Sequence, residues 1–421
     1  MIGIFTKPLE TVDAADLVEL CERRWPEGYT VEFKRTLPHR QGREDAWIAG
    51  GNRVEEYAYE KIFAEIVAFA NGQGGTLVLG IAETKDKPPC ADIVNPVPRV
   101  GELARRFDDK ARTAIDPPLP RLHIRPIETE AGAGAIVFRL GPSRSAPHRL
   151  TSNGRSYRRH GASTIEMNMR EIQDMTLNVA RGTAGIKAAF AERRAAFQEW
   201  GNKSGQTRAL GALRITAIPL EPMLDLGRLF GRRDLWPQDR RYKISVGGTT
   251  YEVVTPAQDT SERPILRGTS HFGDASFQVS RREIHQDGKV DIWIGRAPRP
   301  LPGSADAEEL LILYHGWTLG AVLEVLTMVD LLRTESGAPE AEYGVEIEIV
   351  KFGANKARFA YIEFGGGAMG GQYLIQPPIF LPPLVVGGTS TFEQALNSID
   401  VDMFDAIGIR REKPAPLKLT S

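Results

Sequence analysis

The sequence has few cysteines and no cysteine or histidine cluster. Only Cys21 and Cys90 occur among 421 residues, and they lack any metal-ligand spacing. The seven histidines are scattered and include no His-Glu-x-x-His motif, so a zinc enzyme is not indicated. So few cysteines also argue against a disulfide scaffold and favour a reducing compartment.

An excess of charge of one sign and a long apolar run are also absent. The formal net charge is −1, so any surface that binds a polyanion must be local. No segment reaches the roughly 18 apolar residues that span a bilayer, and the N-terminal residues lack the features of a signal peptide. We therefore expect a soluble, cytoplasmic protein without a membrane partner.

The length and the pattern of predicted elements indicate two domains. A chain of 421 residues is long for one hydrophobic core. Residues 1–180 mix strands and helices without a repeat, which predicts an α+β or mixed α/β domain. Residues 181–205, rich in Ala, Arg and Glu, are predicted as a connecting helix. Residues 206–421 are predicted as a second α+β domain that senses an unknown ligand, regulates the first domain or oligomerises.

Apolar periodicity locates the elements of the first domain. Helices are predicted over 11–24, 54–70, 100–114 and 168–179, and the last begins with a capping box formed by Asn168 and Glu171. Strands are predicted over 29–34, 76–82, 122–127 and 135–140, with a ribbon over 155–160.

The same patterns give the elements of the second domain. Residues 241–246 and 250–254 are predicted as one hairpin, and 343–351 with 358–364 as another, with Glu346 and Glu348 on its solvent face. A strand is predicted over 289–295 and one or two buried helices within 305–335. Ser390 and Glu393 form a second capping box, which opens a helix that ends near Ala406.

A set of charged residues around two of the predicted strands is the candidate active site. Alternation over 29–34 puts Tyr29, Val31 and Phe33 on one face and Glu32 with Lys34 on the other. Glu27 precedes this strand and Glu83 follows the strand 76–82. If the strands are neighbours, the catalytic set Glu27, Glu32, Lys34 and Glu83 converges.

This set has the chemistry of a metal-dependent phosphodiesterase. Mg²⁺ and Mn²⁺ prefer carboxylate oxygens, so Glu27, Glu32 and Glu83 are the predicted metal ligands. The Lys34 ammonium is suited to stabilise the charge that develops on phosphate. Spacing alone favours a simpler interpretation, in which Glu32 and Lys34 form a solvated pair and Glu83 ends a strand.

A second feature is a segment without acidic residues. From Ala131 to Ile165 there is no Asp or Glu, whereas arginines are frequent. Arginine binds phosphate through its planar fork, and an aromatic ring among arginines can stack on a base. The predicted nucleic-acid-binding residues are Arg139, Arg144, Arg149, Arg155, Tyr157, Arg158 and Arg159. A basic rim that only keeps the domain soluble is the alternative.

The glycine-rich turn Asn71–Gly75 is a weaker candidate for phosphate binding. It lacks the lysine of a Walker A loop, and the predicted helix precedes the turn instead of following it. A tight connection between a helix and a strand is the simpler interpretation.

The order of these motifs resembles a known family. Val31–Lys34 is followed by Ile66–Ile81, with its Ala-Phe-Ala-Asn and Gly-Gly elements. The order continues with Ile115–Pro118, Ser143–Pro147, Gly154–Gly161 and Met169–Ile172. Over about residues 25–180 the chain resembles the Schlafen core, an AlbA-like domain.

The resemblance implies a function and a set of residues. Animal Schlafen proteins use this core as a metal-dependent endoribonuclease on tRNA, with two glutamates five residues apart, a lysine and an aspartate. Glu27, Glu32 and Lys34 match that pattern, whereas Ala82 and Glu83 stand where the family has two aspartates.

Three functions follow as expectations. The first is a Mg²⁺- or Mn²⁺-dependent endoribonuclease that acts on tRNA or other structured RNA, in anti-phage defence and as a homo-oligomer. The second is a non-catalytic regulator that binds DNA or RNA. The third is an ATP-binding regulator.

Overall fold

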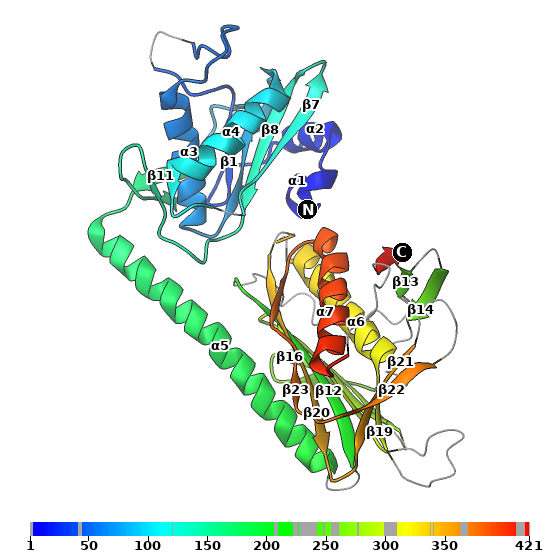
Figure 1. Ribbon diagram of the computed structural model, residues 1–421. Coiled ribbons are helices and arrows are strands. Elements are labelled where there is room, and N and C mark those ends of the chain that lie inside the picture. The colour runs from blue at the N-terminus through cyan, green and yellow to red at the C-terminus, as the bar shows by residue number, and fades with distance from the viewer. Residues whose placement is uncertain are drawn as a thin grey trace. The chain divides into compact units, whose positions relative to one another are not determined.

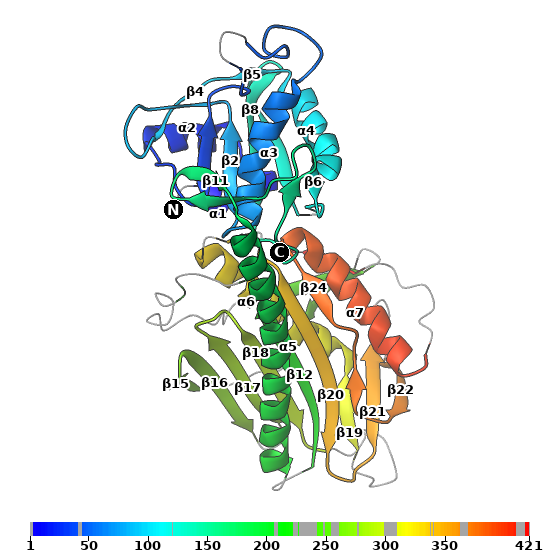
Figure 2. The same cartoon turned by 90° about the vertical axis from the view of Figure 1, so that its left-hand side faces the viewer.

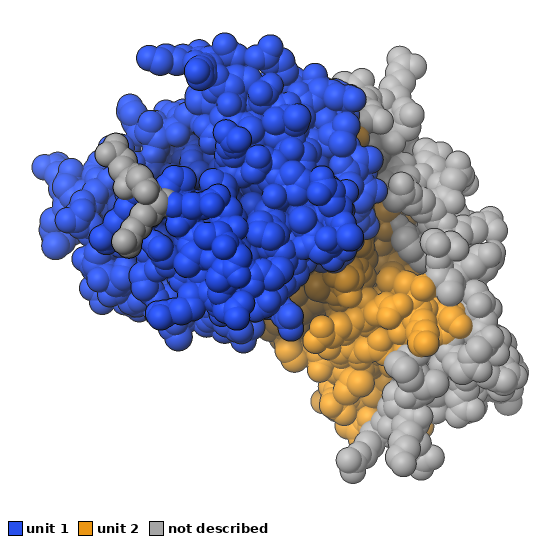
Figure 3. All heavy atoms as spheres, turned by 90° about the horizontal axis from the view of Figure 1, so that it is seen from above, with its two compact units in different colours: residues 1–185, 337–340 blue, residues 186–336, 341–421 orange. Residues whose placement is uncertain are grey.

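The computed structural model describes residues 3–40, 44–119, 121–205, 209–221, 226, 242–246, 249–253, 261–275, 278–298, 310–336, 338–339, 341–362, 369–409 and 417–420. The chain divides into two compact units (Figure 3). The first unit comprises residues 1–185 with 337–340, and the second comprises residues 186–336 with 341–421. Both units combine helices with sheets, so the predicted α+β class is confirmed.

A mixed five-stranded sheet forms the centre of the first unit (Figure 1). Its strands are β1 (Val31–Lys34), β2 (Gly75–Leu79), β8 (Ala133–Leu140), β5 (Val97–Pro98) and β7 (His123–Glu130). β1 and β2 are parallel, and the other pairs are antiparallel. The parallel pair requires a crossover, which the helix between these two strands supplies.

Helices cover both faces of this sheet. They are α1 (Gly3–Thr6), the 3-10 turn η1 (Leu9–Thr11), α2 (Ala14–Glu22), α3 (Glu56–Ala70) and α4 (Val100–Ala114). Leu77 and Leu79 pack in one core with α3 and α4, whereas Val78 packs in another with α1 and α2. Because both faces of β2 are buried, its sequence is continuously apolar instead of alternating.

The predicted strand 76–82 is two strands in the structure. β2 ends at Leu79, and β3 (Ile81–Glu83) pairs with β4 (Ala91–Val94) in a separate two-stranded sheet. Gly80, at φ 105°, lies between them. A residue with a Cβ is strained at this angle, and the Cβ would also lie 3.0 Å from the Ala135 Cα. Gly80 thereby turns the chain so that Glu83 leaves the central sheet.

Two further strand pairs follow. β6 (Ile115–Asp116) pairs with β9 (Arg149–Leu150), and β10 (Tyr157–His160) pairs with β11 (Ser163–Glu166) to form the predicted ribbon.

One long helix, α5 (Met169–Gly205), joins the predicted helices 168–179 and 181–204 (Figures 1 and 2). The predicted capping box is present, since the Glu171 N–H donates to Asn168 Oδ1 at 3.0 Å and the Asn168 N–H donates to Glu171 Oε2 at 2.8 Å. The first half of α5 belongs to the first unit and the second half to the second unit.

An eight-stranded antiparallel sheet forms the centre of the second unit. Its strands are β15 (Ser261–Ile265), β16 (Gly268–Ala275), β17 (Gln278–His285), β18 (Val290–Arg296), β12 (Leu210–Pro219), β20 (Tyr343–Phe352), β23 (Ile379–Phe380) and β24 (Leu384–Val386). Helices α6 (His315–Glu335) and α7 (Phe392–Ala406) pack in its main core, and Phe197 of α5 packs in a smaller core with Trp293.

Two small sheets and a short helix complete the second unit. β19 (Leu311–Tyr314), β21 (Ala357–Ile362) and β22 (Met369–Ile375) form one sheet. β14 (Thr249–Val253), β13 (Tyr242–Val246) and β25 (Lys418–Thr420) form the other, so the first predicted hairpin is confirmed. The 3-10 turn η3 (Thr389–Thr391) precedes α7.

Helix α6 is long and apolar enough to cross a membrane by length and composition. Within the second unit, however, 78% of its most apolar window is buried. Such burial is typical of the core helix of a folded domain, and the hydropathy of α6 is weak evidence for a membrane span.

The second predicted hairpin is wrong. β20 pairs with β12, β23 and β24, whereas β21 pairs with β19 and β22. Glu348 is 1% exposed and not on a solvent face, because Arg214 of β12 pairs with it at 2.7 Å. Within the region predicted as helices, residues 311–314 form a strand. The side chain of Ser390 does not cap α7, whose N-cap residue is Thr391.

Asn71 at the end of α3 fixes the segment that carries the ribbon. Its side chain is 6% exposed and donates to the carbonyls of His148 (2.9 Å) and Tyr157 (3.0 Å). Its Oδ1 accepts the His148 N–H at 2.7 Å. The Asn71–Gly75 turn is therefore a structural connection, as the simpler interpretation predicted.

We predict that Asn71→Ala lowers the free energy of unfolding by at least about 2 kcal/mol, because buried backbone groups lose their partners. The measurement is calorimetric unfolding of the full chain. The control is Asn95→Ala, because the Asn95 side chain forms hydrogen bonds only with Arg35 among the described residues, both at an exposed site, and its loss should cost under about 1 kcal/mol. Equal losses in the two variants would contradict this role.

Candidate active site

Strand β1 brings Glu32 and Lys34 to the face of the sheet that α3 covers. Val31 and Phe33 pack in the opposite core, as the alternation predicts. Tyr29 does not follow the pattern, because it precedes the strand and is 56% exposed. Glu32 is 4% exposed and forms an ion pair with Lys34. The interpretation of this pair as solvated is therefore wrong.

Arg159 of β10 holds the other side of Glu32. Its Nη2 donates to Glu32 Oε2 at 2.9 Å and to the Gly28 carbonyl at 2.7 Å. Its Nη1 lies 2.6 Å from Glu65 Oε2 and donates to Thr164 Oγ1 at 3.1 Å. The guanidinium also lies over the Phe69 ring, 4.9 Å from its centroid. Both oxygens of Glu32 thus accept from a cation.

Glu65 of α3 is a fourth carboxylate of this cluster and was not among the predicted site residues. It pairs with Arg159 and accepts a hydrogen bond from the Thr164 hydroxyl. Burial and then the charge of Glu32 raise the pKa of Glu65. A signal was present, since Glu65 is the one charged residue between Ile62 and Ala70. A charge inside an apolar helical stretch requires a partner.

Glu27 is buried next to these groups. Its Oε1 accepts the Phe33 N–H at 2.9 Å, and no cation pairs with it among the residues that the structure describes. Burial, together with the charges of Glu32 and Glu83, raises the pKa of Glu27 to about 7.

Glu83 lies within electrostatic reach of the same cluster. Its pKa is raised by burial and by the charges of Glu32 and Glu65, although Lys34 opposes the shift. The pKa of Lys34 is also raised, since Glu32, Glu65 and Glu83 outweigh the effect of burial. The structure therefore brings the four predicted catalytic residues into one interacting group.

These residues fit a divalent cation by their chemistry. The donors are carboxylate oxygens, and among the described residues no cation forms an ion pair with Glu27 or Glu83. Among the described residues, however, the ligand atoms of Glu27, Glu32 and Glu83 do not all lie within 4.8 Å of one another. A bound ion would have to draw them together.

Two of the six predicted nucleic-acid-binding arginines are buried inside the protein. Arg139 and Arg159 are 5% and 6% exposed, so their prediction as surface contacts is wrong in this structure. Arg139 donates to the backbone carbonyls of Ile4 and Lys7.

Three other arginines of the set lie nearer the surface and form ion pairs with acidic residues. The pairs are Arg149–Asp116, Arg155–Glu166 and Arg158–Glu171. These acidic residues lie outside the acid-free segment 131–165 in the sequence. The fold brings them next to the arginines of that segment, and their ion pairs offset its positive charge. Arg144 is exposed, and the half-buried Tyr157 accepts a hydrogen bond from Asn153 through its hydroxyl.

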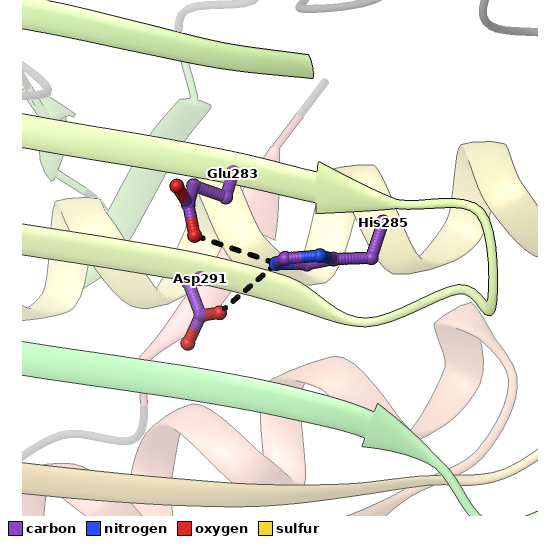
Figure 4. A group of neighbouring side chains, drawn as sticks. All are labelled: Glu283, His285 and Asp291. Atoms are coloured by element: carbon purple, nitrogen blue, oxygen red, sulfur yellow. Dashed lines mark ion pairs between the residues drawn. The ribbon is translucent and has the colours of Figure 1, made fainter. Parts of the chain in front are cut away.

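A second cluster lies in the second unit (Figure 4). Glu283, His285 and Asp291 have ligand atoms all within 4.8 Å of one another. Arg193 pairs with both carboxylates, and Arg281 pairs with Glu283, so two cations already balance two anions.

The pKa of Glu283 agrees with this balance. Burial alone would raise it, but His285 and the two arginines lower it to about 2. We interpret this cluster as a structural network that holds α5 on the sheet, not as a metal site.

A family model matches most of the sequence of the first unit. The family model described as Schlafen, AlbA_2 matches residues 27–168. This range begins at Glu27 and contains Glu32, Lys34, Glu65, Glu83 and Arg159. The comparison with curated proteins gives no match.

One solved structure is similar to part of the chain. It is the N-terminal domain of an ATP-dependent DNA helicase RecG-related protein from Nitrosomonas europaea, at 16% identity and a TM-score of 0.24. The similarity covers 38% of this chain and 95% of that chain. A score this low supports no inference. The family match carries the assignment, and the first unit therefore contains a Schlafen AlbA_2 domain over residues 27–168.

Proposed function

We propose that the first unit is a Mg²⁺- or Mn²⁺-dependent endoribonuclease that acts on tRNA or other structured RNA. The observation that carries this proposal is a charge imbalance. Among the described residues, four carboxylates (Glu27, Glu32, Glu65 and Glu83) interact with only two cations, Lys34 and Arg159. The cluster therefore lacks two positive charges, which one divalent cation supplies.

A deficit of this kind is costly to the fold. Burying an uncompensated carboxylate costs free energy, and the group responds by raising its pKa. Strongly shifted carboxyl groups gather at functional sites because catalysis, and not stability, retains them. The Schlafen AlbA_2 assignment supports nucleic acid as the partner and phosphodiester hydrolysis as the reaction.

Each residue of the cluster has its own role in this proposal. Glu27, Glu32 and Glu83 would hold the cation, which when bound polarises the phosphate and lowers the pKa of water. Lys34 stays protonated because its pKa is raised, so it can neutralise the charge that develops on the phosphate oxygens. Substrate would lie on the exposed side of this group, near the less buried Glu83.

A second candidate is a non-catalytic regulator that binds DNA or RNA. The observation in its favour is that Lys34 and Arg159 already neutralise Glu32, the central glutamate of the motif. An ATP-binding role has less support, because the Asn71–Gly75 turn is occupied by structural contacts.

We predict that Glu83→Gln lowers the rate of tRNA cleavage about 10²-fold and leaves the fold intact. Glu83 makes no side-chain hydrogen bond or ion pair in the part of the chain that the structure describes, so its loss removes a ligand without breaking a contact. The measurement is cleavage of purified tRNA with Mn²⁺ or Mg²⁺, beside a chelator control. Glu128→Gln, on the exposed part of β7, is the matched control.

Glu32→Gln separates the two candidate functions. A nuclease loses cleavage and keeps RNA binding, which a gel-shift assay at fixed salt measures. Intact tRNA with the wild-type protein and either metal would overturn the nuclease and leave the regulator. Cleavage that persists in the chelator would overturn the metal requirement.

The raised pKa of Glu27 predicts a pH-dependent stability. Between about pH 5 and 7 the folded protein holds a proton that the unfolded chain has released, so the free energy of unfolding falls as pH rises. Glu27→Gln does not take up this proton, so its free energy of unfolding relative to the wild type should increase by about 2.5 kcal/mol from pH 5 to 8. The measurement is calorimetric unfolding in a chelating buffer. A constant difference across this range would contradict the shifted pKa.

A further inference from the structure

We propose that Arg159 is a positioning residue of this site, which fixes the Glu32 carboxylate for the reaction. The inference rests on the proposed nuclease function. It gives Arg159 a role different from the contact with nucleic acid that its sequence context indicated.

The contacts of Arg159 join elements that are distant in the sequence. From β10 it reaches Glu32 on β1, Glu65 on α3 and the carbonyl of Gly28. Its side chain is 3% exposed, so these contacts are shielded from water. The pairs are separated by 127 and 94 residues along the chain, and Arg159 thus brings two carboxylates to one point.

The planar shape of the guanidinium allows Arg159 to make all of these contacts. Its donors lie in a rigid plane, so one side chain can hold two carboxylates and a carbonyl at once. Lysine carries the same charge on a single nitrogen and cannot reproduce the fork. Since Lys34 occupies Oε1 of Glu32 and Arg159 occupies Oε2, the Glu32 carboxylate has one orientation.

The ribbon that carries Arg159 is itself held in place. The Tyr157 carbonyl accepts from Asn71 at the end of α3, and Arg158 pairs with Glu171 at the start of α5 at 2.7 Å. Arg159 therefore projects from a strand fixed on both sides. A carboxylate held this rigidly is what a near-attack geometry requires, because a misplacement of about 1 Å can cost about 10²-fold in rate.

Arg193 in the second unit offers a matched control. It is also buried, at 8% exposure, and it also bridges two carboxylates, Glu283 and Asp291. A purely structural role predicts the same consequences for both arginines, namely a loss of stability without a change in the properties of the folded molecules.

The experiment compares Arg159→Lys and Arg159→Gln with Arg193→Lys and Arg193→Gln in the full chain. Mn²⁺ affinity is measured by electron paramagnetic resonance, and single-turnover tRNA cleavage is measured at saturating Mn²⁺. Both values are corrected for the folded fraction.

We expect the two readouts to separate for Arg159. Arg159→Lys keeps the charge and loses the fork, so cleavage falls about 10²-fold while Mn²⁺ affinity changes little. Arg159→Gln removes a positive charge near the cluster, so it binds Mn²⁺ at least as tightly as the wild type and still cleaves slowly. The Arg193 variants should keep both properties.

Two results would overturn the inference. Wild-type cleavage by folded Arg159→Lys would show that the fork is not needed. A parallel loss of Mn²⁺ affinity and cleavage would show a general disruption of the site. If the wild-type protein neither binds Mn²⁺ nor cleaves tRNA, the proposed function itself fails, and this role of Arg159 fails with it.

Discussion

The clustering of four carboxylates beside one sheet, with Glu27 and Glu32 buried, is the constraint on which the first unit depends. Each ionised carboxylate taken out of water needs a cation, hydrogen bonds or a proton. Lys34 and Arg159 supply cations to Glu32 and Glu65. Among the described residues, Glu27 accepts only the Phe33 N–H, and burial raises its pKa to about 7.

The arrangement of the strands and helices brings these acidic residues and the two cations close to one another. β1 and β2 are parallel, so α3 must cross between them and carries Glu65 over the strand that holds Glu32. The turn at Gly80 takes Glu83 out of the sheet, but leaves it close enough to interact with Lys34. Asn71 then ties the end of α3 to the ribbon that carries Arg159. The crossover, the turn and the hydrogen bond each involve a short segment, yet together they bring distant parts of the chain to one site.

The parts of the site that could be predicted from the sequence are the local ones. Strand alternation placed Glu32 and Lys34 on one face, and the positions of Glu27 and Glu83 next to the two predicted strands added these two carboxylates. Glu65 and the role of Arg159 were missed, because their partners lie about a hundred residues away and no local pattern reports such a pairing. The charge asymmetry of 131–165 was misleading for the same reason.

The same holds for the fold. Features that depend on neighbouring residues could be predicted from the sequence, whereas the pairing of distant strands could not. Helices α3 and α4 follow from periodicity, and the capping box of α5 follows from two residues three apart. The hairpin expected from 343–351 and 358–364 failed, although the connection is short, because β20 finds its partner in β12. Strand pairing is decided by which apolar and charged faces match. Arg214 of β12 and Glu348 of β20 are such a match.

The two buried clusters of this chain show how a structural network differs from a candidate site. In both, an arginine bridges two carboxylates that are far from it in the sequence. In the second unit a further arginine completes the balance, and the pKa of Glu283 falls to about 2. In the first unit, Glu27 and Glu83 form no ion pair among the described residues, and burial raises the pKa of Glu27 to about 7. Geometry alone would favour the second cluster as a metal site, since its ligand atoms are the closer ones. The ion pairs reverse that choice, because arginines already pair with Glu283 and Asp291, whereas no cation forms an ion pair with Glu27 or Glu83 among the described residues.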